Sequence, residues 1–143
     1  NQTLVNSNFI GRTLGELTDV TPVYILSTNC SDEDLLSTIL KTLNNSAKKV
    51  KAPDRSEFPM IQKKILSDLK EKSFSKLYVT SSSCCIRVEG NSMNIYPNKL
   101  MTEGQPKDGL IWVEEDKVVI EENTANVDTL VLKVKEMLSR KYY

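Results

Sequence analysis

The chain has 143 residues, of which 39% are hydrophobic and 27% charged, and its 19 basic side chains balance its 19 acidic ones. This composition is typical of one soluble globular domain. The neutral balance disfavours duplex DNA or an anionic membrane as the main partner, because such binding requires an excess of positive charge. The chain contains no histidine, which excludes Ser-His-Asp and Cys-His catalysis and histidine-ligated zinc.

Residues 1–21 are polar with scattered apolar positions, and they predict an N-terminal arm ahead of one domain over 22–143. Four apolar residues of this arm could share one face of a short helix: Phe9, Ile10, Leu14 and Leu17. Residues 22–28 are apolar on both faces and rich in strand formers, which predicts an interior strand.

The sequence Ser31-Asp32-Glu33-Asp34 resembles a capping box, with aspartate in the usual glutamate position, and predicts a helix that ends at Asn44. The basic segment 47–56 has no apolar period and indicates a loop. A second helix should begin near Ser56 or Glu57, with Pro59 in its first turn.

From Lys76 the apolar period changes to two, which predicts strands over 76–79 and 86–88, followed by a turn at Gly90-Asn91 and a strand over 93–96. Residues 97–109 contain prolines and glycines, and we expect them to form a loop. Two short strands, 110–113 and 118–120, flank the acidic tetrad 114–117, and this order predicts a second hairpin. A last helix should begin at about Asn126, where apolar residues recur at helical spacing.

These elements predict an α+β fold in a single domain. The expected sheet is mixed but mainly antiparallel, with two helices after the first strand and one helix at the C-terminus. The parallel component would arise if the strand over 22–28 joined the later strands by a crossover.

The cysteines predict neither a disulfide framework nor a catalytic site. Their number is odd, and Cys84 and Cys85 are neighbours that would point to opposite faces of a strand, so which of them is buried stays open. We expect them to pack as small apolar side chains in a reducing, intracellular compartment. Three sequences, which begin at Asn1, Asn29 and Asn44, match the N-glycosylation pattern and would instead favour a secreted protein.

Other candidate sites have simpler interpretations. The acidic cluster Glu114-Glu115-Asp116 could hold Mg²⁺, but a solvated turn is the favoured interpretation. The loop 104–109 has two glycines and a lysine but does not match the phosphate-binding loop pattern. The sequence therefore predicts no metal, no cofactor and no enzymatic activity.

The leading hypothesis is a non-enzymatic protein-protein interaction domain, a subunit or domain of a larger intracellular assembly with other protein subunits as partners and no membrane contact. Aromatic side chains are common anchors of protein interfaces. The residues expected to contact a partner are Tyr96, Trp112, Lys133 and Tyr142.

The alternative hypothesis is a nucleic-acid-associated module that uses the basic loop over 48–55. Its contacts would be Lys48, Lys49, Lys51 and Arg55. No aromatic residues alternate with these cations to stack on bases, which makes this alternative the weaker one.

Overall fold

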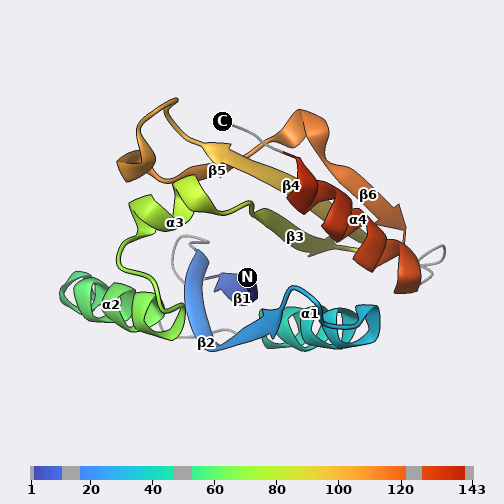
Figure 1. The fold of residues 1–143 in the computed structure, drawn as a ribbon, viewed down its shortest axis with the longest axis horizontal. Coiled ribbons are helices and arrows are strands. Elements are labelled where there is room, and N and C mark those ends of the chain that lie inside the picture. The colour runs from blue at the N-terminus through green and yellow to red at the C-terminus, as the bar shows by residue number, and fades with distance from the viewer. Residues whose placement is uncertain (1, 11–16, 47–52, 122–126, 141–143) are drawn as a thin grey trace. The chain divides into compact units, whose positions relative to one another are not determined.

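The computed structural model describes residues 2–10, 17–46, 53–121 and 127–140 (Figure 1). The chain divides into two compact units, Asn1–Lys70 and Glu71–Tyr143, which we call unit 1 and unit 2 and describe separately.

Unit 1 begins with two antiparallel strands, β1 (Gln2–Ile10) and β2 (Leu17–Ser27). The helical turn expected around Phe9 is therefore wrong, because Phe9 pairs with Thr18 in this ladder. Backbone hydrogen bonds to a partner strand outweigh the weak apolar helical period of this segment, which is interrupted by two glycines. The division into an arm and one domain is not tested and stays a prediction.

Helix α1 (Asp32–Ser46) lies against both strands of unit 1. The N–H of Asp34 donates to Oγ of Ser31 over 3.1 Å, which confirms the predicted serine cap. The hydroxyl groups of Thr38 and Thr42 are buried, and each donates to a carbonyl one turn earlier, of Asp34 and Thr38 respectively. These polar side chains therefore sit inside the unit without an unsatisfied donor.

The second helix also begins where the sequence predicted. A short 3₁₀ helix, η1 (Arg55–Glu57), leads into α2 (Phe58–Asp68), and Pro59 lies in the first turn. The N–H of Asp54 donates to Oε2 of Glu57 over 2.7 Å, which fixes the entry into this turn.

Unit 2 opens with a helix, α3 (Phe74–Thr80), where the alternation of Leu77 and Val79 predicted a strand. That prediction is wrong, and the reason is local. Oγ of Ser73 accepts a hydrogen bond from the N–H of Lys76 over 3.2 Å and caps the helix. The rings of Phe74 and Tyr78, four residues apart, then stack at 5.9 Å.

Strand β4 (Ser92–Leu100) is the centre of the sheet in unit 2. It pairs with β3 (Cys84–Glu89) through a turn at Gly90, whose positive φ of 60° suits glycine. The other edge of β4 pairs first with β5 (Leu110–Trp112) and then with β6 (Val118–Glu121). A short 3₁₀ helix, η2 (Pro106–Asp108), lies in the connection from β4 to β5.

The hairpin predicted between residues 110–113 and 118–120 is wrong, because β5 and β6 both pair antiparallel with β4. They run along β4 as one interrupted strand, and the 3₁₀ helix η3 (Glu114–Asp116) is the interruption. The N–H of Val113 donates to the carbonyl of Pro97 over 2.8 Å, so the pairing continues up to the start of η3.

Helix α4 (Val127–Ser139) packs on β4 and β3. Four of its side chains are buried: Leu130, Val131, Val134 and Met137. In the sheet Ile95, which is 0% exposed, shares a face with its ladder partners Ile86 and Val118. Because these apolar residues need cover, we assign them to the side facing α4, which we call the helix-covered face.

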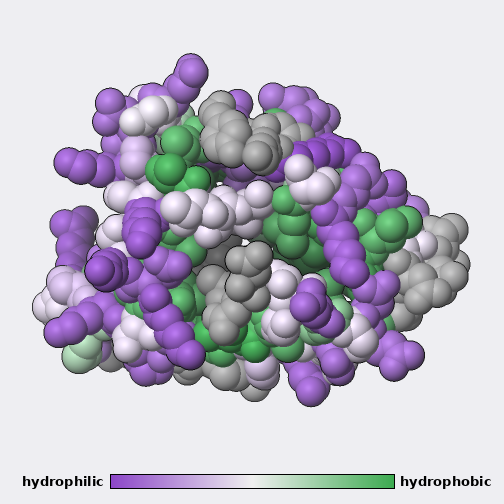
Figure 2. Space-filling model, viewed as in Figure 1, coloured by the Kyte–Doolittle hydropathy of each residue, from purple (hydrophilic) through white to green (hydrophobic). Residues whose placement is uncertain are grey.

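The α+β class, the mainly antiparallel pairing, the two helices after the strand over 22–28 and the C-terminal helix are confirmed. Every strand pairing among the described residues is antiparallel, so the expected parallel component is not among them. In the space-filling view, hydrophilic residues prevail on the surface and apolar residues show as green areas between them (Figure 2).

Candidate partner-binding surface

Two of the residues predicted to contact a partner, Tyr96 and Trp112, lie side by side. Trp112 pairs with Asn98 across the ladder, two residues from Tyr96, so both side chains project from the same face of the sheet. Their ring centroids are 5.5 Å apart with an interplanar angle of 34°. Tyr96 is only 2% exposed whereas Trp112 is 37% exposed, so Trp112 presents the aromatic surface and Tyr96 supports it.

Two cations lie over these rings. The guanidinium carbon of Arg87 is 5.0 Å from the ring centroid of Trp112, and Nζ of Lys117 is 5.9 Å from that of Tyr96. Both distances are within the range of cation–π attraction. Tyr96, Trp112, Arg87 and Lys117 form a cluster that we call the aromatic face.

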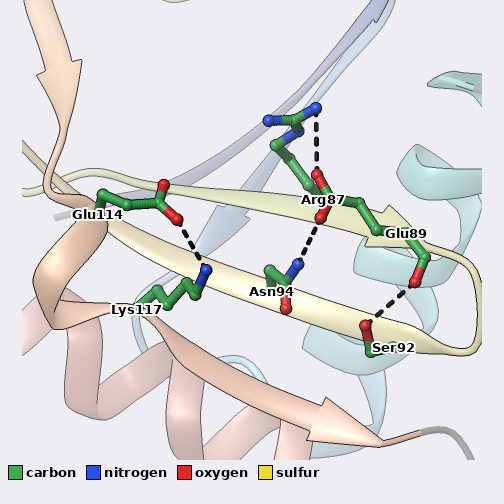
Figure 3. Close-up of polar contacts among 6 residues, drawn as sticks. All are labelled: Arg87, Glu89, Ser92, Asn94, Glu114 and Lys117. Carbon is green, nitrogen blue, oxygen red and sulfur yellow. Dashed lines mark hydrogen bonds and ion pairs between the residues drawn. The ribbon is translucent and has the colours of Figure 1, made fainter.

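Carboxylates hold both cations in place (Figure 3). Glu89 accepts from Arg87 and Asn94: Nη2 of Arg87 is 3.2 Å from Oε1, and Nδ2 of Asn94 donates to Oε2 over 2.9 Å. Nζ of Lys117 donates to Oε1 of Glu114 over 2.7 Å. This hydrogen bond, with the charge of Glu114, raises the pKa of Lys117, which is therefore charged at neutral pH.

The aromatic face lies on the side of the sheet opposite α4. Arg87 and Asn94 are ladder partners, one residue out of step with Ile86 and Ile95 on the helix-covered face. In Figure 3, the labelled polar side chains are drawn in front of the sheet and α4 lies behind it. Unit 2 therefore has one apolar, helix-covered face and one polar and aromatic face.

Lys133, another predicted contact residue, belongs to α4 and is not brought to the aromatic face. Its Nζ donates to Oε2 of Glu136 over 2.9 Å, and Nη2 of Arg140 reaches Oε1 over 3.0 Å. The hydrogen bond from Lys133, followed by that from Arg140, lowers the pKa of Glu136. Tyr142 lies outside the described residues.

Of the predicted nucleic-acid contacts, only Arg55 is within the described part of the chain, where it is exposed at the start of η1. Lys48, Lys49 and Lys51 lie outside that part. The nucleic-acid alternative stays a prediction.

The cysteine thiols are free and partly buried. Burial, with the adjacent Cys85, raises the pKa of Cys84 from 9.0 to about 12. Burial also raises the pKa of Cys85, although the positive charge of Arg87 opposes the shift. Both thiols are protonated at neutral pH, which suits packing rather than nucleophilic attack.

The acidic cluster lies in η3, where Glu114 and Glu115 are exposed. Among the residues that the structure describes, no group of three or more histidine, cysteine, aspartate or glutamate side chains is arranged to hold a metal ion.

Sequence reasoning missed the roles of Arg87, Glu89, Asn94 and Lys117. The first three could have been found from the β3–β4 hairpin, because a turn at Gly90-Asn91 brings Arg87 opposite Asn94. Lys117 had no such signal, since its position depends on how η3 interrupts the edge strand.

No family model matches the chain, and no curated protein matches it. Four solved chains match its fold, and two of them are the following. A protein of unknown function, NMB0488 from Neisseria meningitidis, is 19% identical with a TM-score of 0.66, over 94% of this chain and 84% of the other. A chain of the CdiA-CT/CdiI toxin and immunity complex from Yersinia pseudotuberculosis is 14% identical with a TM-score of 0.58, over 96% of this chain and 95% of the other.

In the part of the chain that the structure describes, no helix has both the length and the apolar character needed to cross a membrane.

At these identities the two neighbours show that this chain has the same α+β fold as they do.

Proposed function

We propose that this chain is a non-enzymatic protein-binding module and that it contacts its partner through the aromatic face of unit 2. The observation that carries the proposal is the way Trp112 is held. The indole is 37% exposed, lies 5.5 Å from the buried ring of Tyr96 and has the Arg87 guanidinium over it at 5.0 Å.

This arrangement suits binding for an energetic reason. Tryptophan, tyrosine and arginine are the side chains most enriched among the residues that dominate interface energies. A side chain already confined by its neighbours loses less rotamer freedom when a partner covers it. The contacts of Trp112 with Tyr96 and Arg87 therefore lower the entropic cost of using it as an anchor.

One of the two structural neighbours supports the same class of function. It comes from a toxin and immunity complex, and the match covers 95% of that chain. A protein partner of that kind, a toxin or an immunity protein, is therefore the first to test.

Other features support binding without catalysis. The chain has no histidine, and the two thiols of β3 have raised pKa values.

Three cysteines without a disulfide suit a reducing, intracellular compartment.

The proposal is tested by purifying the tagged full chain from its native cells with nuclease treatment, then identifying and titrating any stoichiometric protein. We expect Trp112→Ala to weaken that complex by about 2 kcal/mol, or roughly 30-fold in affinity. The matched control is Leu132→Ala, which removes a 63% exposed apolar side chain from α4, the helix on the opposite side of the sheet.

The control variant should retain the affinity of the unmodified chain. If the Trp112→Ala variant bound the partner with the same affinity as the unmodified chain, the aromatic face would not be part of the interface. If the co-purifying proteins are lost on nuclease treatment, the nucleic-acid alternative would be favoured instead.

A further inference from the structure

The buried amide of Asn94 has hydrogen-bonding groups that the described part of the chain leaves unused. Asn94 is 5% exposed and lies on the central strand of the sheet, on the side of the aromatic face. Its Nδ2 donates to Oε2 of Glu89 over 2.9 Å, and no other residue that the structure describes bonds to this side chain. Since an asparagine amide offers two N–H donors and an acceptor oxygen, one N–H and the oxygen remain for a ligand.

The carboxylate of Glu89 fixes which way this amide points. A carboxylate only accepts hydrogen bonds, so the nitrogen of Asn94 faces Glu89 and the oxygen points away from it (Figure 3). Turning the amide over would set two acceptors against each other. The edge of the amide that carries the oxygen is therefore the one left for another molecule.

A partner that supplied a donor to this oxygen would gain affinity from it. An acceptor that loses water on burial and gains no donor destabilises a protein, and such groups are rare in native structures. The protein surface comes close to Asn94 on both sides, because its ladder partners Arg87 and Val119 are exposed, the Arg87 side chain by 42% and Val119 by 47%. A side chain of the partner that entered between them would reach the amide.

The charges around Asn94 favour a neutral side chain. The two cations of the aromatic face already have their carboxylates, since Arg87 pairs with Glu89 and Lys117 with Glu114. A further charged side chain would lose its water here without gaining a counter-ion. A carboxylate, in addition, has no hydrogen to donate to the oxygen of Asn94.

Among neutral groups, a carboxamide fits best. It carries an N–H and an oxygen on one edge, so it can fill the acceptor and the donor of Asn94 together. A trans peptide group carries them on opposite edges, and a hydroxyl group has a single atom for both.

We propose that Asn94 determines the specificity of the aromatic face by binding the side-chain amide of a glutamine or asparagine of the partner protein. This inference rests on the proposed function and adds the chemistry of the partner. Trp112 supplies the exposed anchor, and Asn94 selects the side chain that enters nearby. A site that pairs with a polar group rejects an analogue without that group, because its own buried polar atoms are then left unpaired.

The test uses the isotope-labelled full chain and three synthetic peptides that differ at one position. That position is glutamine, methionine or glutamate, and leucines flank it to contact Trp112 and Val119. The side-chain NH₂ signals of Asn94 are assigned by through-bond correlation to its backbone and followed by NMR. We expect the glutamine peptide to shift these signals saturably and the other two to bind at least about tenfold more weakly.

A pair of matched variants tests the same contact in the cellular complex. Asn94→Leu and Asn91→Leu make the same substitution, and Asn91 is an exposed residue of the turn between β3 and β4. We expect Asn94→Leu to weaken the complex about tenfold and Asn91→Leu to change it less than twofold. The urea midpoint of Asn94→Leu should be no lower than that of the unmodified chain, because the substitution removes an unsatisfied buried oxygen together with the bond to Glu89.

Three results would overturn the proposal: no saturable shift with the glutamine peptide, equal binding of the glutamine and methionine peptides, or equal affinities of the two variants for the partner. The peptide comparison needs no variant, so it decides the matter even if Asn94→Leu does not fold.

The proposed function has a separate test, since it depends on the cellular complex and on Trp112→Ala. A complex that needs Trp112, together with no response to the glutamine peptide, would keep the proposed function and reject the amide site. A response to the glutamine peptide without any cellular protein complex would keep the amide site and reject the proposed function.

Discussion

Trp112 and Tyr96 show how much of a candidate surface can be predicted from residue type. Both were singled out from the sequence because aromatic side chains anchor interfaces, and the fold places their rings 5.5 Å apart. Residue type could not predict that Tyr96 would be buried under that contact. It also could not predict Arg87 over the indole, because Arg87 and Trp112 belong to strands on opposite edges of β4.

The two adjacent cysteines also behave as individual side chains whose environment decides their chemistry. At pH 8 a thiol with a pKa of 9.0 is roughly one-tenth ionised, whereas Cys84, at about 12, is ionised to roughly one part in ten thousand. We therefore expect native Cys84 to react with iodoacetamide at least about 100-fold more slowly than the same residue in the urea-unfolded chain. Tandem mass spectrometry of the labelled peptide measures both rates.

The same shift has a direction for stability. Folding raises the pKa of Cys84, so its protonated thiol stabilises the fold fully below pH 9.0, and that contribution is lost as the pH rises toward about 12.

Labelling at pH 8 that proceeds equally fast in native and unfolded protein would contradict the buried environment of this thiol.

At the scale of elements, α3 shows why a period of two is an unreliable sign of a strand. Leu77 and Val79 alternate with polar neighbours, yet the segment is a helix because Ser73 caps it and Phe74 stacks on Tyr78 one turn later. Both helical signals were present in the sequence, but in a helix of seven residues they span hardly more than one turn.

The cap of α3 gives a testable prediction. Ser73→Ala removes the side-chain acceptor of the Lys76 N–H and should lower the free energy of unfolding by about 1 kcal/mol. Ser73→Asp keeps an acceptor at the same place and should restore most of the loss. Urea unfolding followed by far-UV circular dichroism measures both.

The control for this series is Ser82→Ala, since Ser82 is an exposed residue between α3 and β3. It should change the free energy of unfolding by less than about 0.5 kcal/mol. If Ser73→Ala were no more destabilising than this control, the cap would not contribute to stability.

At the scale of the whole molecule, the stability of unit 2 depends on the layer between α4 and the sheet. Ile95 in the centre of β4 is 0% exposed, and Met137 of α4 is 1% exposed. Ile95→Ala should lower the free energy of unfolding by about 3 kcal/mol, because it leaves a cavity in a close-packed layer.

Val119→Ala is the matched control, since Val119 lies on the next strand but is 47% exposed. It should cost less than about 1 kcal/mol in the same thermal or urea unfolding measurement. If the two substitutions lowered the free energy of unfolding equally, the face that carries Ile95 would be no more tightly packed than the face that carries Val119.

The sequence by itself determined the elements whose signals are local. The serine cap of α1, the glycine turn between β3 and β4 and the apolar period of α4 each involve residues a few positions apart, so their contacts form at little entropic cost. Tertiary structure decided the pairing of Phe9 with Thr18, the interruption of the edge strand by η3 and the assembly of the aromatic face. These depend on the hydrogen-bond partners and the register that another strand supplies, which a local pattern of residue types does not encode.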